Sequence, residues 1–350
     1  MVAYSSLDRV LHRLALQSLS IAELSFDIDQ RMVAADPQDI IAERHVFVAG
    51  LARAGTTALM RRFHATGAYR SLTYQDMPFV LAPNLWRKLS GGSQNVSAAV
   101  ERAHGDGILV DAQSPESLDE VFWRLFAGDD YLSERQLIPH TPDADLTRKF
   151  VGYVNAILNA QDERKLLYLS KNNNNILRLG AIRQAFPQAL ILVPFREPLS
   201  HAGSLLRQHR HFIKVHREDP FSLSYMTWLA HHEFGEDHRP FQFDRGRGQS
   251  AQLSDIDSLN YWLEIWCATY EWLASNAPTD AIFVCYEDLC GDTEVWARLA
   301  ELAGGAAESG QEEPFRLGRW SVDAEADADL LERATIIYSR LMDQARAALR

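Results

Sequence analysis

The chain has 350 residues, of which 47% are hydrophobic and 23% charged, proportions typical of a soluble globular protein with room for a full core. Its net charge of −12 argues against a general nucleic-acid-binding protein, which would be basic, and no apolar run approaches the length of a membrane span. Three cysteines without metal-ligand spacing and an N-terminus without a signal-peptide pattern favour a cytoplasmic protein.

The N-terminal segment is predicted to form a helical arm. Between residues 5 and 30, leucine, isoleucine and valine recur at helical spacing and give a broad apolar face. We expect residues 1–40 to form this arm, which packs on the core or serves as a lid or as the contact within a homo-oligomer. Residues 41–350 are expected to form a single α/β domain, with inserted substrate loops at 77–105 and 205–256.

A short strand, a glycine-bounded turn and a helix are predicted at the start of this domain. Residues 45–49 are apolar and rich in β-branched and aromatic side chains, which predicts a buried strand. Gly50 and Gly55 then enclose four residues, and the segment that begins at Thr56 has helical periodicity. Backbone N–H groups and the positive end of the helix dipole bind phosphate in such a unit. The sequence therefore predicts an anion site at residues 50–57.

This glycine loop differs from the Walker A sequence at one informative position. Thr56 stands where Walker A has the lysine that reaches the β- and γ-phosphates, and Arg53 puts a cation inside the loop instead. The difference disfavours hydrolysis of ATP or GTP and favours a nucleotide whose single 5′-phosphate carries a short transferable group. An ordinary strand-to-helix turn without a ligand is the alternative.

Asp76 is the first candidate for a general base. A second short strand is predicted within residues 69–79, and Asp76 lies in the loop that follows it. Because the carboxyl ends of parallel strands share one edge of a sheet, we expect Asp76 near the glycine loop. A helix-capping or turn role for this aspartate is the alternative.

His104 and Glu116 are the reserve candidates for the base. Both flank a strand predicted at residues 107–111. Glu116 also has a simpler explanation, because Ser114 and Pro115 before it predict a helix N-terminus in which Glu116 is an acid of the first turn.

A lysine and an arginine end two further predicted strands. Residues 165–171 predict a strand with Lys171 at its carboxyl end, followed by four asparagines that predict a turn and a helix cap. A buried parallel strand then ends at Arg196, and Ser204 follows within two turns of the helix that Pro198 begins. A guanidinium and a hydroxyl so placed can bind one phosphate dianion. For Lys171, an exposed strand-end lysine is the alternative.

In this order, the segments resemble the sulfotransferases that use 3′-phosphoadenosine 5′-phosphosulfate (PAPS). Their 5′-phosphosulfate loop reads Pro-Arg-Ser-Gly-Thr-Thr, whereas residues 52–57 read Ala-Arg-Ala-Gly-Thr-Thr and lack the serine hydroxyl. Their 3′-phosphate site has an arginine and a serine at the spacing of Arg196 and Ser204. Residues 286–289 match their Tyr-Glu-Asp-Leu at a late strand end, and the resemblance covers roughly residues 45–300.

The resemblance implies a three-layer α/β fold with a central, mainly parallel sheet like that of the P-loop NTPases. It implies transfer of the sulfuryl group of PAPS to a hydroxyl or amine, with an acidic general base at Asp76 and no metal. Lys171 matches the lysine that contacts the bridging oxygen, and Arg196 with Ser204 would hold the 3′-phosphate. The residues expected to bind the 5′-phosphosulfate are Arg53, Ala54, Gly55, Thr56 and Thr57.

Two other functions stay open, and the acceptor is unidentified. A small-molecule kinase of the same fold would need a loop lysine and Mg²⁺, and a non-catalytic nucleotide-binding protein would have lost its base. Carbohydrate, lipid, phenol and peptide acceptors all remain compatible with the two predicted loops. Residues 205–256 are rich in histidine, but no metal-ligand spacing repeats there, so we expect a polar substrate wall or a solvated helix rather than a metal site, with a loop at 235–256.

Overall fold

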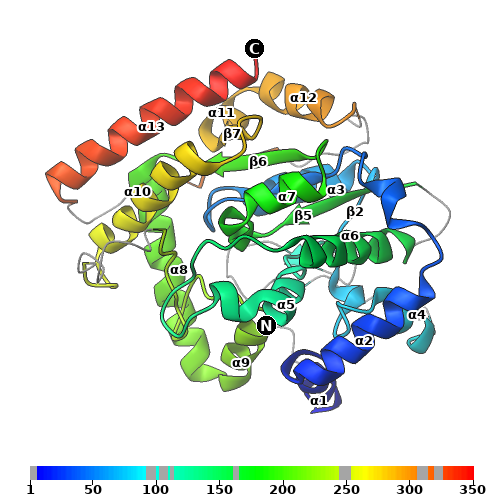
Figure 1. The fold of residues 1–350 in the computed structure, drawn as a ribbon. Coiled ribbons are helices and arrows are strands. Elements are labelled where there is room, and N and C mark those ends of the chain that lie inside the picture. Colours follow the sequence, from blue (N-terminus) through cyan, green and yellow to red (C-terminus); the bar gives the residue numbers. More distant parts are fainter. Residues whose placement is uncertain are drawn as a thin grey trace.

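The computed structural model describes residues 6–91, 100–101, 109–110, 114–160, 165–243, 254–305, 314–318 and 326–350. A parallel five-stranded sheet lies at its centre in the order β2–β5–β1–β6–β7 (Figure 1). The strands are Val46–Val48 (β1), Tyr69–Arg70 (β2), Leu167–Lys171 (β5), Leu190–Phe195 (β6) and Ile282–Cys285 (β7). Outside this sheet, Val100–Glu101 (β3) and Leu109–Val110 (β4) pair with each other in antiparallel fashion.

Successive side chains of the central strands enter two different apolar clusters, because side chains alternate between the faces of a sheet. Val46 and Val48 of β1 pack with three helices: Thr56–Ala65 (α3), Tyr286–Gly291 (α11) and Thr293–Leu302 (α12). Phe47 packs in the opposite cluster. The helices that contribute to this opposite cluster include Glu120–Tyr131 (α5), Ala144–Asn159 (α6), Leu179–Ala185 (α7), Pro198–Glu218 (α8), Leu259–Asn276 (α10) and Ala328–Ala348 (α13). The predicted three-layer α/β fold is therefore confirmed.

The N-terminal segment is helical, as the apolar spacing predicts. Ser6–His12 (α1), a π turn at Arg13–Gln17 and Leu19–Met32 (α2) follow one another, and Ser18 caps α2. Buried Asp29 anchors α2, because its carboxylate accepts from the side-chain amide of Asn84 at the start of Pro83–Leu89 (α4). Large apolar side chains of the arm remain exposed: Val10, Leu14, Leu19, Ile21, Leu24 and Ile28. A homo-oligomer formed through this face stays a prediction.

Two predicted boundaries are wrong. The helix expected to start after Ser114 begins at Glu120. The reason is tertiary pairing, since the backbone N–H of Glu116 donates to the carbonyl of Leu72 and holds this segment extended. The substrate loop expected from residue 205 begins later, because α8 continues to Glu218 and Pro220–Trp228 (α9) follows, in agreement with the helix given as the alternative for this stretch.

A buried polar network joins α5 to the turn after β5. The guanidinium of Arg178 donates to both carboxylate oxygens of Glu120, at 2.7 and 3.0 Å, and both side chains are fully buried. The amide of Asn172 donates to Glu120 Oε2 at 2.7 Å and to Asp119 Oδ1 at 3.2 Å. The network thereby fixes the backbone that follows Lys171.

Replacing Arg178 with methionine is expected to lower the free energy of unfolding by about 3–5 kcal/mol, because it leaves the Glu120 carboxylate buried without its cation. Arg298→Met is the matched control, since the Arg298–Glu301 pair is exposed and such pairs contribute about 1 kcal/mol or less. Urea unfolding of both variants measures the difference. Equal losses in the two variants would contradict this view of the network.

Candidate functional site

The glycine loop connects β1 to α3 at the carboxyl edge of the sheet. Gly55 caps α3 in the left-handed region with φ +90°, and Arg53 has φ +68°, which is uncommon for a residue with a side chain. Helix α3 begins at Thr56, and the first backbone N–H groups of a helix have no acceptor within it. The predicted strand–loop–helix unit is therefore present, with its N–H groups at the edge where the loop turns.

Two side chains from later elements support this loop. His201 Nε2 of α8 lies 2.8 Å from the carbonyl oxygen of Ala52 and donates to it. Burial lowers the pKa of His201 to about 3, so the ring is neutral at pH 7. The ring of Tyr286 fills the space where a Cβ on Gly55 would lie, and its hydroxyl donates to the carbonyl of Arg316 at 3.3 Å. Tyr286 therefore explains why this loop position is glycine.

Gly55→Ala is expected to destabilise the protein by at least about 2 kcal/mol more than Gly67→Ala. Both glycines have positive φ, so both variants carry the backbone strain of about 1–2 kcal/mol. A Cβ at Gly67 meets nothing within 4 Å, whereas one at Gly55 overlaps the Tyr286 ring. Chemical denaturation of both variants separates the overlap from the strain. Equal destabilisation would show that the ring moves aside freely.

Arg196 and Ser204 lie next to the glycine loop, although they follow it by more than 140 residues. Arg196 Nη1 donates to the carbonyl of Arg53 at 3.3 Å, and Arg53 Nε donates to Ser204 Oγ at 3.4 Å. The Glu287 carboxylate lies 3.8 Å from Arg196 Nε. Burial, followed by the charges of Arg53 and Arg196, lowers the pKa of Arg207, one helical turn after Ser204. Arg53, Arg196 and Arg207 therefore place three guanidinium groups at this end of the site, and Glu287 pairs with Arg196.

Lys171 lies at the same edge, beside the strand that leads into the loop. It is the last residue of β5 and is paired in register with Val48, and the N–H of Asn172 donates to the carbonyl of Val48 at 3.1 Å. Its side chain is largely buried. The structure therefore brings Lys171 to the loop together with Arg196 and Ser204.

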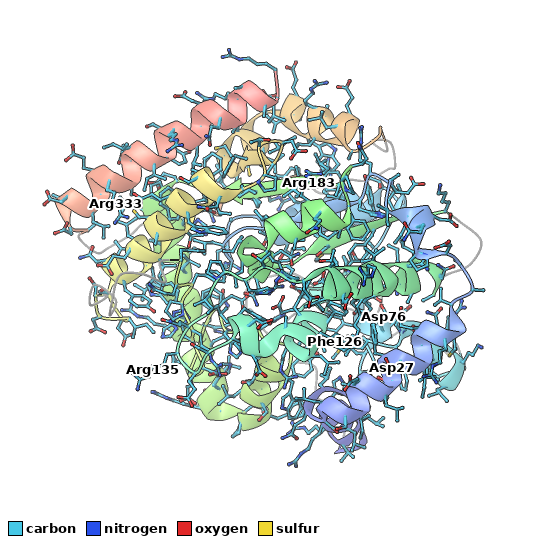
Figure 2. All side chains as sticks on the ribbon, viewed as in Figure 1. Asp27, Asp76, Phe126, Arg135, Arg183 and Arg333 are labelled. Carbon is cyan, nitrogen blue, oxygen red and sulfur yellow. The ribbon has the colours of Figure 1, made fainter. Side chains whose placement is uncertain are left out.

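Asp76 is held by contacts of its own. Its carboxylate accepts from Arg70 Nη2 at 2.5 Å and from the Thr73 N–H at 2.7 Å, and it closes the capping box of the short helix at Tyr74–Asp76. The side chain lies inside the molecule (Figure 2). It follows β2, which is two strands from β1, or about 10 Å at the usual strand spacing. These contacts match the capping alternative, and its role as a base stays a prediction.

Of the two reserve bases, Glu116 lies among the described residues. The carboxylate of Glu116 accepts from the Tyr74 hydroxyl at 3.3 Å and from the Ser117 N–H at 3.0 Å. His104 lies outside the described residues.

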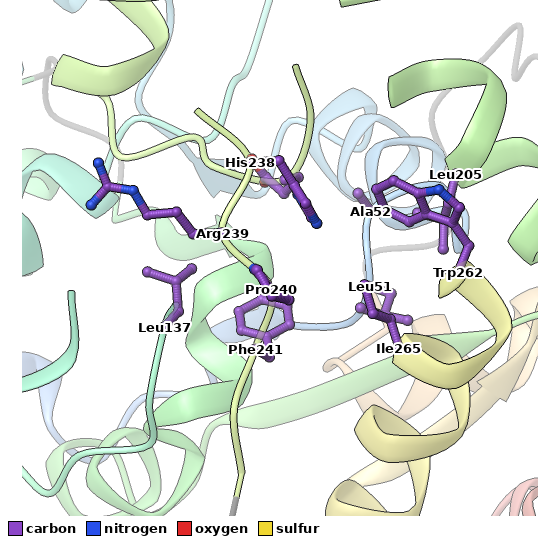
Figure 3. Close-up of a pocket in the computed structure, with 11 residues that line it drawn as sticks. Leu51, Ala52, Leu137, Leu205, His238, Arg239, Pro240, Phe241, Trp262 and Ile265 are labelled. Atoms are coloured by element: carbon purple, nitrogen blue, oxygen red, sulfur yellow. The ribbon is translucent and has the colours of Figure 1, made fainter. Parts of the chain in front are cut away.

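A small apolar pocket borders the glycine loop (Figure 3). Leu51 and Ala52 of the loop form one side, together with side chains of α8 and α10. Pro240 and Phe241 lie across from them. Its free volume is about 20 Å³.

The family model described as "Sulfotransferase family" matches residues 45–240, which is more than half of the chain. The chain belongs to the sulfotransferase family. A comparison with curated proteins gives no match.

Several solved sulfotransferases are similar to this one along most of its length. STF1 from Mycobacterium tuberculosis H37Rv has 14% identity over 97% of this chain and 86% of its own, with a TM-score of 0.47. STF9 from Mycobacterium avium has 13% identity over 97% and 79%, with a TM-score of 0.46. A sulfotransferase from Alicyclobacillus acidocaldarius has 15% identity over 88% and 96%, with a TM-score of 0.38.

In this sulfotransferase, two residues at the site were missed from the sequence. His201 supports the loop. It could have been found from the sequence because it lies three residues before Ser204, on the same face of α8. Glu287 pairs with Arg196 and accepts from the N–H of Glu197 at 3.2 Å, and its signal was the Tyr-Glu-Asp-Leu segment at residues 286–289.

Two further kinds of site are absent from the described part of the chain. No helix there is long and apolar enough to cross a membrane. No three histidine, cysteine or acidic side chains gather there in a way that would hold a metal ion.

Proposed function

We propose that this sulfotransferase transfers the sulfuryl group of PAPS to a hydroxyl or amine of a small-molecule, glycan or lipid acceptor. The observation that supports it is the contact between the glycine loop and the Arg196–Ser204 pair, through Arg53. One adenylate with phosphates at its 5′ and 3′ positions is the ligand that such adjacent anion sites suit.

In this proposal the two anion sites divide the donor between them. Residues 53–57 bind the 5′-phosphosulfate through backbone N–H groups and the helix dipole. Arg196 and Ser204 bind the 3′-phosphate by charge-assisted hydrogen bonds, and Arg207 adds positive charge. Arg53 contributes to both ends, because its backbone belongs to the loop and its guanidinium contacts Ser204.

Sulfuryl transfer requires the protein to position donor and acceptor and to compensate the charge that develops. The acceptor oxygen attacks sulfur while the bond from sulfur to the bridging oxygen breaks, and Lys171 and Arg53 offset the charge that builds on the oxygens. A carboxylate takes the acceptor proton. For Asp76 to do so, its ion pair with Arg70 would have to open.

Thermal unfolding with two ligands tests the proposed function. We expect adenosine 3′,5′-bisphosphate to stabilise the protein, by about 2.7 kcal/mol at one hundred times its Kd, and ATP with Mg²⁺ to stabilise it much less. Stabilisation by ATP with Mg²⁺ alone would favour the kinase alternative. Stabilisation by the bisphosphate without transfer of labelled sulfate to any acceptor would favour a binding protein.

A further inference from the structure

We propose that the apolar pocket beside the glycine loop receives an apolar part of the acceptor, and that Glu233 takes the proton of the acceptor hydroxyl. The acceptor is then a phenol or an apolar alcohol. This inference rests on the proposed function, since it assumes that the loop holds the donor.

The pocket borders both anion sites. Leu51 and Ala52 precede Arg53 in the loop, and Leu205 follows Ser204 on α8; all three side chains line the pocket. Trp262 and Ile265 of α10 extend the same wall (Figure 3). A group bound here lies next to the loop that the proposal assigns to the transferred sulfuryl group.

The walls favour an apolar, uncharged guest. The side chains that line the pocket are mainly aliphatic and aromatic, so a sugar would bury hydroxyls without partners, at about 1–3 kcal/mol each. A volume of about 20 Å³ admits one small group, such as a methyl group. A larger ring would displace Pro240 and Phe241, which are only partly buried.

Glu233 supplies a carboxylate in this apolar wall. Its Oε1 accepts from the amide of Asn173 at 2.8 Å, and Asn173 is two residues after Lys171. The contact connects the carboxylate to the turn that carries the proposed catalytic lysine. Glu233 therefore lines the pocket and also contacts the turn that follows Lys171. Neither Asp76 nor Glu116 lines the pocket.

His238 and Arg239 line the pocket together with Glu233, but neither forms an ion pair with its carboxylate. Burial lowers the pKa of His238 to about 4, so its ring is uncharged at pH 7. Arg239 donates to Asp237 through Nε and Nη2, at 3.0 and 2.8 Å. No ion pair to Glu233 exists among the described residues, whereas Asp76 is paired with Arg70. Glu233 can thus accept a proton without an ion pair being broken.

Sulfuryl transfer to the acceptor forms one bond to sulfur and breaks another. A bond forms between the acceptor oxygen and sulfur, and the bond between sulfur and the bridging oxygen breaks with its electron pair on the 5′-phosphate of adenosine 3′,5′-bisphosphate. The acceptor proton moves to a Glu233 carboxylate oxygen and is later released to water.

Labelled PAPS and an acceptor panel test the inference. The panel holds 2-naphthol, 4-methylphenol and 1-hexanol as apolar members and glucose and chitobiose as polar members. We expect transfer to the apolar members, and Glu233→Gln should lower kcat by about 10²–10⁴-fold and remove the rise of rate with pH. Glutamine still accepts from Asn173, so the fold and the stabilisation by the bisphosphate should persist.

Two further variants sharpen the result. Glu236→Gln is the matched control, because Glu236 is an exposed acid three residues along the chain, and its rate should equal that of the wild type. Ile265→Phe fills the pocket and should raise KM for the phenol at least tenfold without changing stabilisation by the bisphosphate.

The outcomes separate the two proposals. Failure of the bisphosphate to stabilise the wild type rejects the proposed function. Stabilisation together with transfer to sugars alone, or to no member of the panel, rejects the apolar acceptor. A Glu233→Gln variant that keeps kcat within threefold rejects the assignment of the base.

Discussion

Replacing Arg196 with methionine is expected to weaken binding of adenosine 3′,5′-bisphosphate by about 10²–10³-fold, the largest binding loss we predict. The variant removes a guanidinium that is largely buried, and loss of one partner of such a charge pair costs about 2–5 kcal/mol. It also leaves the Glu287 carboxylate facing the phosphate without its cation, which adds repulsion. Calorimetric titration of the bisphosphate into wild type and variant measures the effect.

Arg210→Met is the matched control for this loss. Arg210 lies on the same helix, α8, but it is exposed and pairs with Asp257 at 3.7 Å. Its loss should leave the Kd within twofold of the wild type. If Arg196→Met binds the bisphosphate within threefold of the wild type, Arg196 does not hold the 3′-phosphate.

Replacing Lys171 with methionine is expected to lower kcat by about 10²–10³-fold while the Kd for PAPS stays within a few-fold. The proposed role of the ammonium is to stabilise charge that develops on the bridging oxygen only in the transition state, and removal of one such group costs about 3–4 kcal/mol of transition-state stabilisation. In PAPS the bridging oxygen is still bonded to sulfur and does not yet carry this charge, so binding of PAPS should change little. Single-turnover transfer of labelled sulfate isolates the chemical step.

Lys165→Met is the matched control for Lys171→Met, because Lys165 lies just before the other end of β5. Lys165 is exposed and pairs with Glu43, far from the carboxyl edge of β5. It should leave both kcat and Kd unchanged. A Lys171→Met variant that turns over at the wild-type rate, or one that only weakens donor binding, would contradict the proposed role.

The parts of the fold that could be predicted depend on local signals. Residues 190–195 are continuously apolar and became the buried strand β6, and the two glycines of the loop mark a turn that a side chain would block. The segment predicted to be helical from Thr56 forms helix α3, because its apolar residues recur at helical spacing. Such signals need no knowledge of distant residues.

What could not be predicted depends on distant contacts. Nothing near Ser114 reveals that Glu116 pairs with the backbone at Leu72, so the start of α5 was misplaced. The ion pair of Asp76 forms with Arg70, which lies on the other side of a turn. The position of Glu233 depends on its contact with Asn173, 60 residues earlier. The adjacency of Arg196 to the glycine loop was expected only from the family resemblance.

The most direct measurement is a crystal structure of the protein with adenosine 3′,5′-bisphosphate. We predict the 5′-phosphate on the N–H groups of residues 53–57 and the 3′-phosphate within hydrogen-bond distance of Arg196 and Ser204, in one and the same nucleotide. A bisphosphate that touches only one of these two groups, or that binds elsewhere, would contradict the account.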